Sequence, residues 1–266
     1  MPHAHSRGMV NPEMMERTEE FRTLLNLSTY PVGVKLFERA SEALTVKGAR
    51  VLRATAPCHM AALARYYRRD GVTVATAQGM RCLWGLACLG LIATPERLAR
   101  GDLNLPFTRD EAAARALQAN ILMLGDEGHL FNALLVAPLD LMPVEPDAIV
   151  AYMTPGQALK VLLGFEHGEG RALKGTTLTG QCTVCSAIAR VMRGEDLVID
   201  IPCAGDRTWG LVPDQELVVV LSPGTFDDLL AGMRATDAFA SHPFRPFLDW
   251  PVIFPPEMEP RPSELE

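Results

Sequence analysis

The sequence is poor in histidine and lacks the short motifs of several large enzyme classes. Its 266 residues include 6 histidines, and no HExxH, GxSxG, GxxxxGK[ST] or GxGxxG motif occurs. A zinc protease of the HExxH type, an α/β hydrolase and nucleotide-binding enzymes of the P-loop or Rossmann type are therefore unsupported. We expect the histidines to face solvent in polar segments.

A long apolar run and an excess of basic charge are also missing. No stretch reaches the roughly 20 apolar residues that span a bilayer, and the N-terminal segment lacks the apolar core of a secretory signal. Acidic residues outnumber basic ones by 32 to 25, which gives a net charge of −7. This balance gives no electrostatic reason to bind nucleic acid or an anionic membrane. We expect a soluble, cytoplasmic protein without nucleic-acid or membrane partners.

The composition is otherwise that of an ordinary globular protein, with 48% hydrophobic and 21% charged residues. Chains of this length bury enough surface to fold without a disulfide or a metal. The six cysteines, without an export signal, therefore indicate reduced thiols, metal ligands or nucleophiles and not three disulfides. They are Cys58, Cys82, Cys88, Cys182, Cys185 and Cys203.

Helical and strand patterns alternate along the chain without a regular period, which favours an α+β or mixed α/β fold. The patterns predict helices over residues 11–25, 57–67, 108–118, 154–163, 182–192 and 222–233. They predict strands over residues 31–37, 72–75, 134–138, 148–153, 197–201 and 216–221. We expect one compact unit over residues 11–242, with a loose N-terminus (1–10) and an irregular Pro-rich tail (243–266) that holds seven of the 20 prolines.

Three local expectations concern helix ends and glycines. Thr94 is expected to cap a short helix, with Pro95 as its first residue. Thr108 is expected to cap the helix over 108–118, with Glu111 completing a capping box. The glycine-rich segment 164–175 has the composition of a flexible connector.

The positions of the cysteines carry the chemical information. Cys182 and Cys185 form a CxxC at the start of a predicted helix, where one metal can be held and where backbone N–H groups stabilise thiolate. A single CxxC is a weak signal, because a zinc ribbon needs two. Cys58, Cys82 and Cys203 lie beside turn-forming residues. Cys88 has apolar neighbours in the sequence, which indicates a position in the core.

Two arginines lie close to cysteines in the sequence. Arg81 precedes Cys82, and Arg207 follows Cys203 by four residues. Their guanidinium groups suit an anionic substrate held by paired hydrogen bonds. Plain surface salt bridges are the competing interpretation.

Several segments together resemble the DUF169 family, a family without a defined biochemical function. The resemblance covers roughly residues 20–235, and its segments are PVGVKLF (31–37), the helix that begins near Cys58, MRCLWGLACLGL (80–91), IVAYMTPGQALKVL (149–162) and the stretch 180–223. The positions that match the family pattern are Cys58, Cys82, Gly85, Cys182, Cys203, Gly205 and Arg207. The resemblance thus singles out four cysteines, the number that ligates a [4Fe–4S] cluster or a structural zinc.

Three hypotheses for function stay open at this point. The first is an iron–sulfur protein, an oxidoreductase or lyase acting on a small molecule, with a [4Fe–4S] cluster on Cys58, Cys82, Cys182 and Cys203 and with Cys185 as a substitute ligand. The second is a metal-free enzyme with Cys182 as nucleophile. The third is a non-catalytic binding or sensing protein stabilised by zinc. In the first and third, the four cysteines must converge; homo-oligomerisation is left open.

Overall fold

The structure is a computed structural model that describes residues 11–68, 70–170, 173, 180–237 and 259–264. The expected loose N-terminus (1–10) and residues 243–258 of the expected Pro-rich tail lie outside the described residues. No helix within the described ranges combines the length and the apolar character that crossing a membrane demands.

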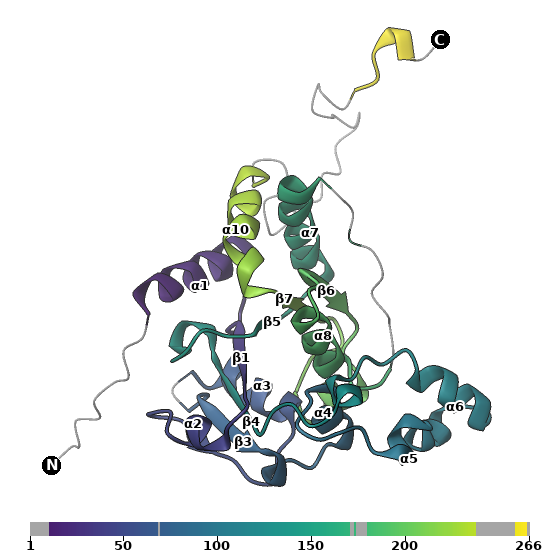
Figure 1. Ribbon diagram of the computed structural model, residues 1–266. Coiled ribbons are helices and arrows are strands. Elements are labelled where there is room, and N and C mark those ends of the chain that lie inside the picture. The colour runs from purple at the N-terminus through teal and green to yellow at the C-terminus, as the bar shows by residue number, and fades with distance from the viewer. Residues whose placement is uncertain (1–10, 69, 171–172, 174–179, 238–258, 265–266) are drawn as a thin grey trace, which may run out of the picture.

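A seven-stranded sheet forms the centre of the fold (Figure 1). The strands lie in the order β2-β3-β4-β1-β5-β7-β6, and all neighbours are antiparallel except the pair β2 and β3. Their bounds are β1 Val32–Phe37, β2 Arg50–Val51, β3 Thr73–Thr76, β4 Ala133–Pro138, β5 Ala148–Met153, β6 Leu197–Asp200 and β7 Leu217–Leu221. Because this sheet takes strands from both halves of the chain, the predicted α+β fold in one unit is confirmed.

Alternation along the strands divides the apolar side chains between two sides of the sheet. Val34, Val150 and Val220 pack in a core with apolar residues of α3 (Pro57–Tyr66), α4 (Leu83–Cys88) and α8 (Thr183–Met192). Their strand neighbours Ile149 and Val219 pack in a second core with α1 (Pro12–Leu25), α7 (Pro155–Glu169) and α10 (Phe226–Ala235). The helices of the first core, or the residues just before them, carry five of the six cysteines.

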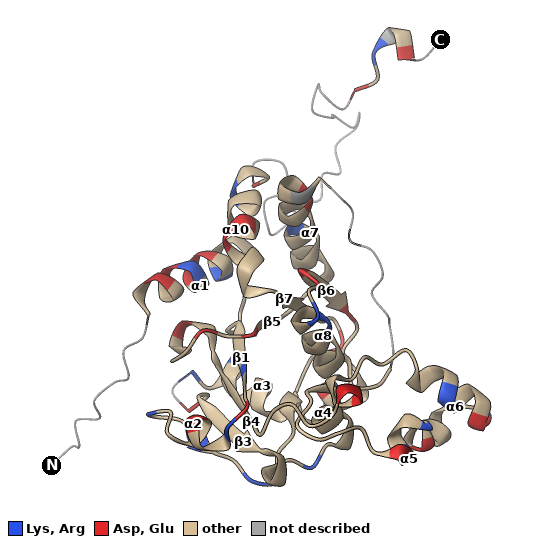
Figure 2. Cartoon of the chain, viewed as in Figure 1, with Lys and Arg blue, Asp and Glu red and all other residues tan. Residues whose placement is uncertain are grey.

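The remaining helices are short. They are α2 Ala40–Leu44, α5 Glu96–Ala99, α6 Glu111–Gln118 and α9 Ala204–Thr208. Short 3₁₀ helices lie at Ala77–Gly79, Asp102–Phe107, Leu124–Glu127, Leu139–Leu141, Pro223–Thr225 and Pro262–Glu264. Basic and acidic residues are mixed along α1, α5 and α6 (Figure 2), so none of these helices carries charge of one sign alone.

Some helix caps follow the local sequence rules and others differ from them. Asn11 caps α1 by accepting the Glu13 N–H at 3.0 Å, and Thr154 and Gln157 form a capping box at the start of α7. The expected cap at Thr108 is wrong, because Asp110 accepts the Ala113 N–H at 2.8 Å and begins α6 there. The Thr108 hydroxyl instead donates to the Asn104 carbonyl at 3.0 Å. Likewise α5 is preceded by Pro95 as its cap residue, and not by Thr94.

The expected connector at 164–175 is also wrong in its first part. Gly164 and Gly168 lie inside α7, which continues to Glu169. A Cβ atom on Gly164 would collide with the backbone and side chain of Met233, and one on Gly232 would collide with the Gly164 backbone. These glycines therefore permit close packing of α7 against α10, and the composition that indicates a loop serves a helix crossing. Residues 171–172 and 174–175 lie outside the described residues.

Candidate functional site

Four helices on one side of the sheet each begin at or beside a cysteine. Cys58 is the second residue of α3, while Cys82, Cys182 and Cys203 are the residues immediately before α4, α8 and α9. Pro57 fits the first position of α3, where its missing N–H leaves no unsatisfied donor. At the next helix, the Gly85 N–H donates to the Cys82 sulfur at 3.4 Å, so this thiol serves as the cap.

These helix starts surround a single cavity of about 200 Å³, named the thiol cavity. Its wall contains five of the six cysteines, together with the rings of Trp84, Phe107 and Trp209; the five are Cys58, Cys82, Cys182, Cys185 and Cys203. The structure thus brings together the four cysteines that the sequence singled out, and it adds Cys185. Their role as metal ligands stays a prediction.

The sixth cysteine lies behind this wall. Cys88 is fully buried in the core at the end of α4 and is not part of the cavity lining. Its sulfur lies 3.4 Å from the Cys182 sulfur, to which it donates a hydrogen bond. Cys88 is therefore a core residue, as predicted, that supports one member of the cavity wall.

Close packing positions the two helices that carry Cys58 and Cys82. A Cβ atom on Gly85 would lie 3.0 Å from the ring of Pro57 and 3.5 Å from the Cys82 sulfur. Glycine at this position lets the first turn of α4 approach the first turn of α3. The family-pattern glycine thus has a physical role at the site.

Cys182 has an unusual backbone. Its φ is 50° and its ψ is 38°, which lie in the left-handed region that glycine tolerates and other residues occupy at a cost. That cost is about 1–2 kcal/mol for a residue with a Cβ atom. A thiol retained at such a position is consistent with a function for its side chain.

This geometry makes a stability prediction. We expect Cys182→Gly to be more stable than Cys182→Ala by about 1 kcal/mol, because both remove the thiol and only glycine relieves the left-handed strain. Urea denaturation of the two metal-free variants measures the difference. Equal midpoints would show that the backbone at this position is not strained.

Burial has the largest effect on the pKa of three of the five cavity thiols. It raises the pKa of Cys58 and Cys82, and it raises that of Cys203 to about 11, with the Asp206 carboxylate adding to the effect at Cys58 and Cys203. At Cys182 the hydrogen bond with Cys185 lowers the pKa, but the bond with Cys88 and burial together leave it well above its ordinary value. No Lys, Arg or His is found among the described residues that line the cavity. The thiols are therefore protonated at neutral pH unless a cation replaces their protons.

Asp206 is a site residue that the sequence analysis missed. It is fully buried, lines the thiol cavity, and accepts the Cys203 N–H with Oδ2 at 3.2 Å. Its other oxygen, Oδ1, has no hydrogen-bond partner, and burial raises its pKa to about 6. The capping-box spacing between Cys203 and an acid three residues later is the sequence signal that could have identified it.

Comparison of the sequence with known proteins identifies a family. The profile of the DUF169 family, described as "Uncharacterised ArCR", matches residues 20–232. The chain belongs to the DUF169 family. An uncharacterised protein of Methanocaldococcus jannaschii, MJ0308, is 27% identical to this DUF169 chain over 226 residues, which cover 84% of the chain and 94% of that protein. No solved structure matches it.

The two arginines predicted to bind substrate differ in their surroundings in this DUF169 chain. Arg207 is half-buried, and its Nη1 donates to the carbonyl oxygens of Val212 and Pro213. It holds the loop that follows α9 and does not line the thiol cavity. Arg81 is exposed and lines a second hollow, next to the thiol cavity.

The donors of the thiol cavity suit a soft metal, because thiolates bind zinc, copper(I) and iron–sulfur clusters. An unpartnered buried carboxylate oxygen at the same cavity is a further group that a cation would stabilise. Within the described ranges, however, no three His, Cys, Asp or Glu side chains are arranged so that they could hold a metal ion. The type of donor therefore fits a metal centre, but the sulfurs are spread over the cavity wall and are not gathered around one metal position.

Proposed function

We propose that this DUF169 protein is an iron–sulfur protein, with a [4Fe–4S] cluster held in the thiol cavity by Cys58, Cys82, Cys182 and Cys203 and with Cys185 able to substitute for one of them. One observation carries the proposal. Five cysteines, from two segments separated by 100 residues of sequence (58–82 and 182–203), line a single small cavity. Unrelated buried cysteines acting as small hydrophobic residues have no reason to gather in this way.

The electrostatics favour a metal centre over a free thiol nucleophile. A reactive cysteine has a depressed pKa, usually beside a basic group. Burial raises the pKa of the cavity cysteines. At Cys182, the suggested nucleophile, the hydrogen bond with Cys185 lowers the pKa, but the bond with Cys88 and burial leave it well above normal. A metal displaces thiol protons directly, so a high pKa in the metal-free protein does not oppose ligation.

The size of the cavity favours a cluster over a single ion. Four thiolates around one tetrahedral zinc, at about 2.3 Å from it, lie only about 3.8 Å apart and enclose no further space. The thiol cavity has about 200 Å³ between its walls. A cluster with several iron and sulfide atoms fills such a space with less movement of the helices than the binding of a single zinc ion requires. In addition, α3 and α8 have 10 residues each and direct their N-termini toward it, which stabilises an anionic group.

A bound cluster supplies electron transfer or, at an iron without a cysteine ligand, Lewis-acid chemistry. Five thiols for four ligand positions are compatible with either role. The aromatic rings of Trp84, Phe107 and Trp209 make part of the cavity wall apolar. On this basis we assign the protein to the oxidoreductases or lyases that act on a small molecule. Six free cysteines suit a reducing compartment, so a cytoplasmic location is part of the proposal.

Anaerobic purification after expression with added iron tests the proposal. We expect brown protein with a broad absorbance near roughly 400 nm and about four iron and four acid-labile sulfide atoms per chain. Colourless protein with one zinc per chain would replace the cluster by the zinc hypothesis. Metal-free protein under the same conditions would contradict both.

A further inference from the structure

We infer that a hollow beside the thiol cavity binds a small aromatic carboxylate and presents it to the wall that contains Cys82. This outer basin has a volume of about 530 Å³, within the range of ligand pockets. It shares three lining residues, Cys82, Trp84 and Trp209, with the thiol cavity. A small aromatic carboxylate would be the substrate class of the proposed iron–sulfur protein. Its binding in the outer basin does not require the cluster; only its reaction at the shared wall rests on the proposed function.

The charge of the outer basin specifies an anion. Arg81 and Arg97 line it, and no Asp or Glu is among the described residues that do. Across the described part of the chain, neither arginine takes part in an ion pair. Arg81 Nη1 donates to the carbonyl oxygens of Gln78 and Met80 at 3.0 Å each, which holds the guanidinium in place and leaves its other N–H groups available, and Arg97 lies near enough to the Asp102 carboxylate to lower its pKa. Two guanidinium groups and no acid in the lining of one hollow favour a carboxylate there, in a protein with net charge −7.

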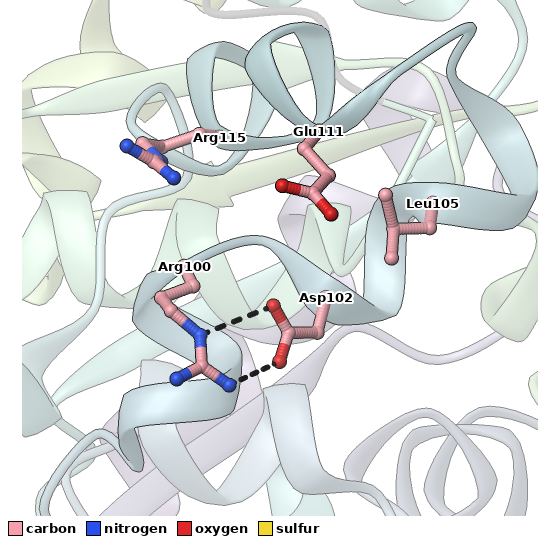
Figure 3. Close-up of a pocket in the computed structure, with 5 residues that line it drawn as sticks. All are labelled: Arg100, Asp102, Leu105, Glu111 and Arg115. Carbon is pink, nitrogen blue, oxygen red and sulfur yellow. Dashed lines mark hydrogen bonds and ion pairs between the residues drawn. The ribbon is translucent and has the colours of Figure 1, made fainter.

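A neighbouring hollow shows the contrast. Figure 3 shows Arg100 and Arg115 in a pocket that also contains Asp102 and Glu111. The Arg100 guanidinium donates to both oxygens of Asp102, at 3.4 and 2.7 Å. The two arginines and two acids of that pocket balance in charge, so the pocket has no net attraction for an anion. The outer basin has two arginines and no acid among its described lining residues, so it attracts an anion.

The aromatic rings of the outer basin specify the rest of the ligand. Trp209, the residue immediately after α9, is 57% exposed, which is unusual for such a large apolar side chain. Trp84 is half-buried, and its Nε1 donates to the Gln118 side chain at 3.4 Å, which fixes the indole. Both rings, together with Leu83 and Leu103, give a flat apolar body a surface to pack against.

Calorimetric titration of the as-purified protein with benzoate tests the inference, with benzamide, acetate and benzylamine as comparison probes. We expect benzoate to bind at least about tenfold more tightly than neutral benzamide or ring-less acetate, and benzylamine not to bind. Arg81→Ala and Arg97→Ala should each weaken benzoate binding about tenfold. Arg39→Ala is the matched control, because that exposed arginine pairs with Glu42 and lines neither the thiol cavity nor the outer basin, and it should leave binding unchanged.

Three results would overturn the inference: no benzoate binding up to about 10 mM, equal affinity for benzoate and benzamide, or an equal loss in Arg39→Ala. Equal binding of acetate would leave an anion site without the aromatic specificity, which contradicts the substrate class. The titration is repeated with the Cys203→Ser variant, because Cys203 does not line the outer basin. Benzoate binding that persists there without metal would uphold the basin separately from the cluster, and metal analysis decides the cluster on its own.

Discussion

Single replacement of Cys58, Cys82, Cys182 or Cys203 by serine is expected to lower the iron and sulfide content by about tenfold or more in at least three of the four variants, the fourth being the one in which Cys185 can substitute, whereas Cys88→Ala keeps both near the wild-type level. Loss of a supporting residue around a metal ligand already costs 10–100-fold in affinity, so loss of a ligand costs at least as much. Metal and sulfide analysis of anaerobically purified variants gives the result, and absorbance near roughly 400 nm follows it.

Cys88→Ala is a demanding control for this series. The Cys88 thiol is as buried as any in the site and lies 3.4 Å from the Cys182 sulfur, but it stands outside the cavity wall. General damage to the core would therefore reduce cluster content in this variant as well. Circular dichroism of each variant separates unfolding from loss of a ligand.

Cys185→Ser decides which cysteines form the ligand set. If Cys185 is a spare, its replacement leaves the iron content unchanged, and one of the other four variants can retain a cluster by using it. If Cys185→Ser loses the cluster and Cys182→Ser keeps it, the site stands with a different member. Wild-type metal content in all five cavity variants would exclude the thiol cavity as the metal site.

Local sequence patterns predicted most of this fold because they are set by near neighbours. Alternation of Val32, Val34 and Leu36 defines β1, and the Thr154-x-x-Gln157 box begins α7 where the pattern placed it. The failures have physical causes of longer range. Gly164 reads as a loop residue, yet it lies within a helix because its lack of a side chain permits contact with α10.

The candidate site was predictable in part for the same reason. Position at a helix start is a local property, so Cys58, Cys82, Cys182 and Cys203 could be selected from sequence and family resemblance. The outer basin could not, because it is formed by segments as distant as Arg97 and Trp209, whose proximity depends on tertiary packing. Asp206 was missed although its capping-box spacing was visible, since an acid after Cys203 has no functional meaning until its burial is known.

The burial of Asp206 has a consequence for stability. Its pKa is raised to about 6 from an ordinary value of 3.8, mainly by desolvation. A carboxyl group with a raised pKa in the folded state holds its proton more tightly there than in the unfolded chain, so stability falls as pH rises through the window between these values. The full penalty, about 3 kcal/mol for about two pH units, applies above pH 6.

Asp206→Asn is therefore expected to stabilise the metal-free protein by about 1–3 kcal/mol at pH 7.5, and to lose this advantage as the pH falls from 6 to 4. Asparagine keeps an oxygen that accepts the Cys203 N–H and removes the buried charge. Urea denaturation across this pH range measures the effect. The control is Asp214→Asn, which changes an exposed carboxyl group and should shift stability little at any pH. If Asp206→Asn is less stable than the wild type at pH 7.5, the ionised carboxylate is stabilised by the cavity and burial is not the dominant influence on it.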